Sequence, residues 1–143
     1  MAIDLIHHIT VAAPADRIYR AITTEEGIRG WWTTDVVMGA RVGDKAVFGF
    51  HKHSVTFEMR IVELTPSSVV RWRCEESNCP EWIGTTQEFR LEPQADGEVL
   101  VKFCHGGWQS DKGHCYPSNT TWGHLMVLLK NYVERGETNL YFT

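Results

Sequence analysis

Several features that mark specialised classes of protein are missing from this sequence. It has no run of lysine or arginine residues, and its formal net charge is -4 at pH 7. No stretch approaches the ~18 uninterrupted apolar residues of a membrane span, and Met1 to His8 shows neither the basic start nor the apolar core of a signal peptide. We therefore expect a cytoplasmic protein that binds neither nucleic acid nor membrane.

Groups of metal-binding side chains are also scarce. Structural zinc sites usually place their ligand pairs about two to four residues apart, whereas Cys104-His105 and His114-Cys115 are adjacent pairs. The sequence therefore predicts neither a metal nor a cofactor. Because the expected compartment is reducing, we expect free thiols rather than disulfides. These thiols are Cys74, Cys79, Cys104 and Cys115.

The composition is that of an ordinary globular protein. Of the 143 residues, 43% are hydrophobic and 22% are charged. A domain of this size buries roughly 68–70% of its unfolded surface, which is enough for a core. No repeat, low-complexity tract or linker is visible. We therefore expect a single domain over residues 1–143.

The first part of the chain combines one strand with two short helices. The residues from Ile3 to Ala13 predict a strand, and Pro14 suits the first turn of the helix that follows. Thr23 and Glu26 form a capping-box pattern, which predicts that a second, short helix begins at Thr23. This helix is expected to end near Gly30.

Apolar residues alternate between Thr33 and His105, which predicts five or six further strands. Turn residues separate these strands at Gly39, at Gly43-Asp44, at Thr65–Ser68 and at Gln94–Gly97. Strands with one apolar face form antiparallel sheets that cover a core with that face.

A long helix near the C-terminus is expected to cover the apolar face of the sheet. Ser118 or Asn119 is expected to cap this helix, and Gly136 is expected to end it. Its apolar stripe consists of Trp122, Leu125, Met126, Leu129 and Val133. The order of these elements predicts an α+β fold.

Three polar residues share the apolar face of the predicted sheet: Thr85, Gln87 and His105. If the strands on either side of Gln94–Gly97 form a hairpin with matched faces, Gln87 lies opposite Phe103 and Thr85 lies opposite His105. Buried polar groups need partners. These residues therefore either bond to one another or to a trapped water, or they line a pocket and orient a ligand.

Short motifs run along nearly the whole chain. They are Val11-x-Ala13-Pro14, Ala21-Ile22-Thr23-Thr24, Trp31-Trp32-Thr33, Trp82-x-Gly84-Thr85, His105-x-Gly107-Trp108 and Leu129-Lys130-x-Tyr132-Val133-Glu134-x-Gly136. In this order and spacing they resemble the SRPBCC (START-like) superfamily, in particular its branch of homologues of the activator of the Hsp90 ATPase. The resemblance implies a helix-grip fold with two short helices after the first strand. In this fold a curved antiparallel sheet of about six or seven strands wraps around the long C-terminal helix and leaves a cavity between them.

Members of this superfamily include carriers of hydrophobic ligands, polyketide cyclases, hormone receptors and co-chaperone domains, so the fold alone does not give the function. The two-domain activators make much of their chaperone contact through an N-terminal domain, for which this chain has no room. A chaperone partner and a homodimer stay open as alternatives.

We expect a small hydrophobic molecule in the cavity, with His105, Gln87 and Thr85 fixing its polar end. The expected ligand-binding residues are Trp31, Phe48, Phe50, Phe57, Met59, Trp72, Thr85, Gln87, Phe89, Phe103, His105, Trp108, Trp122, Met126 and Leu129. No residue is predicted to be catalytic. One alternative is a cyclase- or hydratase-type enzyme that uses His105 as general acid or base. Another is a co-chaperone-like domain that binds protein through an exposed apolar patch.

Overall fold

The computed structural model describes residues 2–142 of the chain. The helices are α1 (Ala15–Thr23), α2 (Glu25–Trp31), α3 (Cys115–Arg135) and the short 3-10 helix η1 (Pro80–Trp82). The strands are β1 (Ile3–Val11), β2 (Asp35–Met38), β3 (Lys45–Phe50), β4 (Val55–Thr65), β5 (Val69–Ser77), β6 (Thr86–Pro93) and β7 (Val99–Trp108).

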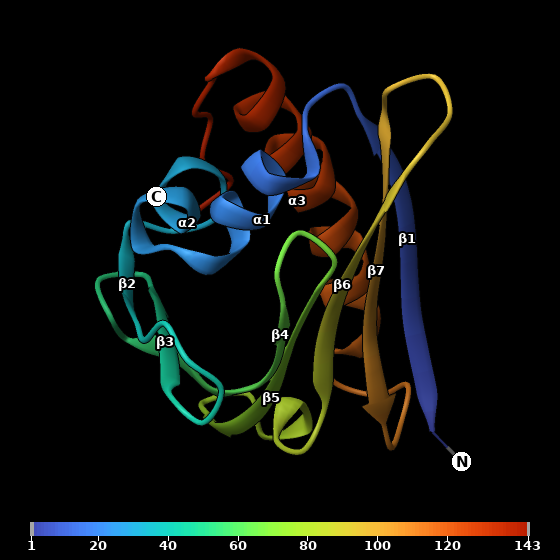
Figure 1. The fold of residues 1–143 in the computed structure, drawn as a ribbon. Coiled ribbons are helices and arrows are strands. Elements are labelled where there is room, and N and C mark those ends of the chain that lie inside the picture. Colours follow the sequence, from blue (N-terminus) through green and yellow to red (C-terminus); the bar gives the residue numbers. More distant parts are fainter. Residues whose placement is uncertain (1, 143) are drawn as a thin grey trace.

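The seven strands form one antiparallel sheet in the order β1-β7-β6-β5-β4-β3-β2. The sheet curves around α3, while α1 and α2 sit on the same concave side near the C-terminal end of α3 (Figure 1). This arrangement confirms the predicted α+β helix-grip fold. No helix of residues 2–142 is long and apolar enough to cross a membrane.

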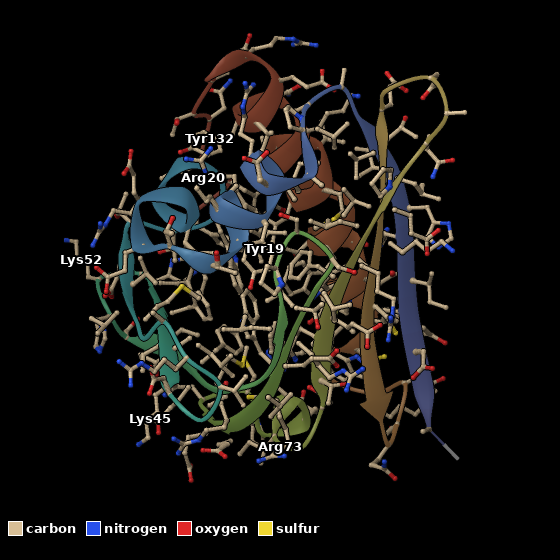
Figure 2. The ribbon with its side chains drawn as sticks, in the orientation of Figure 1. Tyr19, Arg20, Lys45, Lys52, Arg73 and Tyr132 are labelled. Carbon is tan, nitrogen blue, oxygen red and sulfur yellow. The ribbon has the colours of Figure 1, made fainter. Side chains whose placement is uncertain are left out.

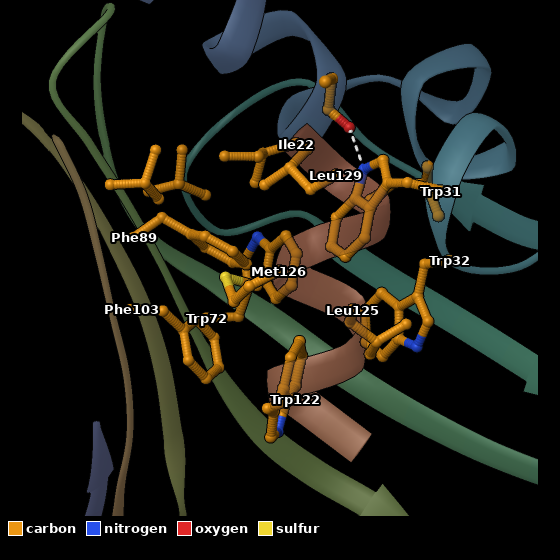
Figure 3. Close-up of a cluster of buried hydrophobic side chains, with 14 of the residues drawn as sticks. Ile22, Trp31, Trp32, Trp72, Phe89, Phe103, Trp122, Leu125, Met126 and Leu129 are labelled. Carbon is orange, nitrogen blue, oxygen red and sulfur yellow. Dashed lines mark hydrogen bonds between the residues drawn. The ribbon is translucent and has the colours of Figure 1, made fainter. Parts of the chain in front are cut away.

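Aromatic side chains fill the space between the sheet and α3. All six tryptophans of the chain are buried. Figure 3 shows the core aromatics Trp31, Trp32, Trp72, Phe89 and Phe103 around the apolar stripe of α3. The Trp32 ring lies 5.2 Å from the Trp122 ring, and the Phe103 ring lies 4.2 Å from it. Burial of so much aromatic surface dominates the stability of such a core.

The opposite, convex face of the sheet is charged. Arg71 donates to Glu88 at 2.7 Å, and Arg60 donates to Glu75 at 2.9 Å. Arg73 points away from the core on this side (Figure 2). The alternation of the sequence therefore assigned the two faces of the sheet correctly.

The starts of the helices differ from the sequence prediction. Pro14 is the N-cap of α1 rather than a residue of its first turn. Thr24, not Thr23, caps α2: its Oγ1 accepts a hydrogen bond from the backbone N–H of Gly27 at 3.0 Å. Thr23 is the last residue of α1, where its hydroxyl donates to the carbonyl of Tyr19. Both threonines can cap a helix, and the cap of α2 is Thr24, the residue that directly follows α1.

We expect Thr24→Ala to lower the free energy of unfolding by about 1 kcal/mol, because it removes the acceptor at the start of α2. Thr23→Ala is the matched control. It removes only a hydroxyl bonded to the preceding turn of α1, which contributes little. Urea unfolding of both variants measures the difference, and a larger loss for Thr23→Ala would contradict this assignment of the cap.

Three other boundaries also moved. β1 ends at Val11 rather than Ala13. The last helix begins at Cys115 with His114 at its N-cap, so the predicted cap at Ser118 or Asn119 is wrong. The helix ends as predicted at Gly136, whose φ of 70° is left-handed. Residues 83–85 were predicted to begin the strand that contains Gln87, but β6 begins only at Thr86, because η1 and the turn after it occupy this segment; Ile83 is exposed.

Candidate functional site

An apolar pocket of about 250 Å³ opens at one end of the core. It lies between the ends of β3 and β4, η1, the N-terminal half of α3 and the segment after α3. Its lining residues are Trp32, Phe50, His51, Val55, Phe57, Cys79, Trp82, His114, Pro117, Ser118, Thr121, Trp122, Leu125 and Phe142.

The walls of this pocket are mainly aromatic rings that also pack on one another. Phe57 lies 4.1 Å from Trp82 and 5.7 Å from Phe50. Trp82 and Trp122 form the wall toward the core, with their rings 6.2 Å apart. An apolar pocket with few polar groups is typical of a site for a small hydrophobic ligand.

Ser118 is a buried polar residue of the pocket wall. Its Oγ accepts a hydrogen bond from the indole N–H of Trp82 at 3.1 Å. Among residues 2–142 no acceptor is recorded for the Ser118 hydroxyl proton. The hydroxyl can therefore donate a hydrogen bond to a polar atom of a ligand.

A hydrogen-bonded pair of Glu81 and His114 lies at the edge of the pocket, which His114 lines. Glu81 accepts hydrogen bonds from the backbone N–H of His114 at 2.8 Å and from its ring Nδ1. Hydrogen bonds from its own backbone and from His114 hold the pKa of Glu81 below its usual range. The ionised Glu81 thereby fixes the start of α3, which supplies five of the fourteen residues that line the pocket.

The predicted polar residues Thr85, Gln87 and His105 do come together, but in a different register. Gln87 lies opposite His105 and Phe89 lies opposite Phe103. The predicted pairs of Gln87 with Phe103 and of Thr85 with His105 are therefore wrong by two residues. A slip of two keeps every side chain on its predicted face, so the three polar residues remain neighbours.

His105 has a defined tautomer in this cluster. Its Nδ1 accepts a hydrogen bond from the indole N–H of Trp122 at 3.0 Å, so a neutral ring carries its proton on Nε2. Nε2 lies 2.8 Å from the Thr85 hydroxyl, and that hydroxyl donates to the carbonyl of Trp82 at 2.6 Å. Burial lowers the pKa of His105 from 6.5 to about 3, which keeps the ring neutral.

The amide of Gln87 is incompletely bonded. Its nitrogen lies 3.0 Å from His105 Nε2 and 3.1 Å from Thr85 Oγ1, while its oxygen is buried without a partner. Turning the amide would let the oxygen accept from His105 but would leave the nitrogen without a partner instead. Either way, one polar atom of Gln87 is unsatisfied, which costs about 1–3 kcal/mol.

The polar cluster does not border the pocket. His105 has no exposed surface, and the rings of Trp82 and Trp108 cover it at 4.4 Å and 4.6 Å. Trp82 and Trp122 separate it from the pocket, because both belong to the pocket wall. A substrate in the pocket would meet these two indoles rather than His105.

Three of the predicted ligand-binding residues line the pocket: Phe50, Phe57 and Trp122. The other twelve lie in the packed core. They are Trp31, Phe48, Met59, Trp72, Thr85, Gln87, Phe89, Phe103, His105, Trp108, Met126 and Leu129, and each is at most 2% exposed. The Trp31 indole donates to the carbonyl of Ala21 at 2.8 Å (Figure 3), which fixes the ring inside the core rather than at a mouth.

Most of the remaining lining residues could not be found by alternation. Cys79 and Trp82 belong to the segment around η1, His51 to the β3–β4 turn and Phe142 to the segment after α3. One signal in the sequence was Pro80, which suits the first turn of the short helix that carries Trp82.

Nucleophilic and metal chemistry find little support in the described residues. Cys74 is 1% exposed, and burial raises the pKa of its thiol to about 12. All four cysteines are free. Among residues 2–142 no group of three or more His, Cys, Asp and Glu side chains could hold a metal ion.

A second groove of about 560 Å³ runs between α1, α2 and the C-terminal end of α3. Its lining includes Arg17, Arg20, Arg135, Glu26 and Glu134. Charges of both signs make this groove a poor site for a hydrophobic molecule. The apolar pocket is therefore the better candidate.

Comparison with known proteins places the chain in a family. A family model described as "Activator of Hsp90 ATPase homolog 1-like protein" matches residues 12–134. The solution structure of the Aha1 dimer from Colwellia psychrerythraea is 30% identical, with a TM-score of 0.84, and the match covers 94% of this chain and 98% of that one. No curated protein matches the chain.

More distant solved structures share the fold. Protein SSP2350 from Staphylococcus saprophyticus is 17% identical with a TM-score of 0.77, and the match covers 96% of each chain. CalU16 from Micromonospora echinospora is 16% identical with a TM-score of 0.75, and the match covers 94% of this chain and 78% of that one. The chain thus has the SRPBCC-type fold and belongs to the Activator of Hsp90 ATPase homolog 1-like family.

Proposed function

We propose that this protein binds a small hydrophobic molecule in the pocket between β3, β4, η1 and α3, in the cytoplasm. The observation that carries the proposal is the pocket itself: about 250 Å³ of space walled largely by aromatic rings at one end of the core. Functional pockets have volumes of about 300–1,000 Å³. This one therefore suits a ligand of one or two rings.

Ligand binding fits the pocket better than catalysis by His105. A general acid or base must come within hydrogen-bond reach of the group that reacts, at about 2.6–3.2 Å. His105 lies behind Trp82 and Trp122, and both of its ring nitrogens already have partners. The buried Thr85–Gln87–His105 cluster thus supports the pocket wall, because His105 accepts from the Trp122 indole and Thr85 donates to the backbone carbonyl of Trp82.

A protein partner is the second candidate, and the family description favours it. The relative from Colwellia psychrerythraea is a dimer, and we propose that this chain also forms a homodimer. Mass spectrometry under native conditions reads the oligomeric state and a retained small molecule in the same spectrum, so one experiment separates these proposals.

Protein purified from its own host should retain a small molecule that native mass spectrometry detects as added mass. Thr121→Trp should remove that mass, because the indole fills the pocket from a half-buried position on α3. Tyr116→Trp is the matched control, since it enlarges an exposed aromatic residue on the same helix outside the pocket. A folded wild-type protein without added mass, or equal retention by Thr121→Trp, would refute the proposal.

A further inference from the structure

The segment after α3 folds back along the helix. Gly136 ends α3, and the residues that follow form a groove with the outer face of α3. The groove is lined by Thr120, Gly123, His124, Val127, Leu128, Asn139, Leu140 and Tyr141. The Tyr141 ring stacks on the His124 ring at 5.2 Å and an interplanar angle of 25°. This course brings Phe142 to the pocket, where it lies among the lining residues together with Trp122 and Leu125 of α3.

Phe142 lies across the mouth of the pocket. Its ring meets the Phe50 ring edge-on at 4.7 Å, and the His51 ring at 6.3 Å. It is one of the residues that line the pocket and packs partly buried against the core. A phenyl ring of the chain itself thus occupies a place where an aromatic ring of a ligand would meet the same wall.

The attachment of this segment is weak. Within residues 2–142 no hydrogen bond is recorded for residues 138–142; the last one joins the backbone N–H of Glu137 to the carbonyl of Asn131. Tyr141 and Phe142 are held by aromatic and apolar packing, and Tyr141 is half exposed. A segment with few hydrogen bonds and few buried contacts opens far more readily than the core.

The other side of the pocket mouth is a strained turn. His51, Lys52 and His53 have φ angles of 51°, 58° and 67°, a left-handed conformation that residues other than glycine rarely adopt. The turn is held by Asp35, which contacts His53 Nδ1 at 2.6 Å, and by the Ser54 hydroxyl, which donates to the carbonyl of His51. Strain of this kind is concentrated at ligand clamps, and here it presents the His51 ring to Phe142.

We propose that Phe142 is an internal occupant of the pocket mouth and that the ligand carries an aromatic ring that displaces it. This inference rests on the proposed binding function and names its ligand class. The ligand is a planar aromatic molecule with one hydrogen-bond acceptor. The acceptor meets the hydroxyl of Ser118, whose proton is free to donate inside the pocket wall.

A fluorescence titration with 6-propionyl-2-(dimethylamino)naphthalene, a planar two-ring probe with a carbonyl acceptor, tests the inference on the full chain. If Phe142 occupies the mouth nine-tenths of the time, the apparent affinity is about tenfold below the intrinsic one. Phe142→Ala should therefore bind the probe about tenfold more tightly than the wild type. Phe142→Tyr keeps a ring at the mouth and should bind as the wild type does.

The double variant Phe142→Ala/Thr121→Trp locates the binding, because the indole at position 121 fills the pocket. Loss of probe binding in this variant, together with the tenfold gain in Phe142→Ala, supports the inference. Equal or weaker binding by a folded Phe142→Ala, with binding still lost on adding Thr121→Trp, overturns the inference and leaves the pocket function standing. Probe binding that is unchanged by Thr121→Trp overturns both the inference about Phe142 and the proposed pocket function. Unchanged thermal unfolding of each variant shows that the probe reports on the folded protein.

Discussion

Replacing Trp122 by alanine is expected to lower the free energy of unfolding by about 3–5 kcal/mol, the usual cost of deleting a buried aromatic side chain. Trp122 is 1% exposed and its ring packs against Trp32 and Phe103. Its indole N–H is also the donor to His105 Nδ1, so the substitution leaves a buried acceptor without a partner.

Chemical denaturation of Trp122→Ala measures this loss. The control is Tyr116→Ala on the same helix: its side chain is 57% exposed, and the expected change is within about 0.5 kcal/mol. A loss below about 1 kcal/mol for Trp122→Ala would mean that the aromatic cluster is not the tightly packed core described above.

We expect the free energy of unfolding to decrease as the pH is lowered, because His105 is buried in its neutral form. Its pKa is about 3 in the folded protein and about 6.5 when unfolded, since burial penalises the charged ring. The unfolded chain thus binds more protons between these values. The contribution of neutral His105 to the free energy of unfolding is complete above pH 6.5. It is lost as the pH falls toward 3, at about 1.4 kcal/mol per pH unit. From pH 7 to pH 5 the loss is about 2 kcal/mol.

Comparing the pH dependence of His105→Gln with that of the wild type isolates this contribution. His124→Gln, which changes an exposed histidine of α3, should keep the wild-type slope. A slope that is unchanged in His105→Gln, or a His105 ring that titrates near pH 6 by NMR, would show that the ring is not held neutral. The window above pH 5 also avoids the carboxylates whose pKa values are lowered by salt bridges.

The α+β architecture could be predicted because a period of two fixes the faces of strands and a period of 3.6 fixes the stripe of a helix. The helix-grip arrangement was implied by the resemblance to the SRPBCC superfamily. The register of β6 and β7 could not be predicted. Pro93 pairs with Val99, so the loop between β6 and β7 is shorter than the predicted register, with Gln87 opposite Phe103, required. A slip by two residues changes no face, and the hydrophobic pattern is therefore blind to it. The clustering of Thr85, Gln87 and His105 was predicted correctly despite the wrong register, because a slip of two residues keeps them on the same face.

The position of the pocket could not be read from residue types. The sequence pattern of an inward-facing aromatic residue is the same whether its side chain is packed or lines a pocket. In the structure Phe48, Trp72 and Phe89 are packed. The mouth depends on the left-handed turn at His51–His53, which contains no glycine, and on Phe142, which follows the last helix. Neither belongs to a periodic element, so only the three-dimensional structure brings them together.

The most direct test of the account is to locate the bound molecule. Intermolecular nuclear Overhauser effects between the compound retained from the host and the protein should involve the methyl groups of Val55, Thr121 and Leu125, which line the pocket. Contacts confined instead to the charged groove at Arg20 and Arg135, with none to these methyl groups, would contradict the claim that the aromatic pocket is the binding site.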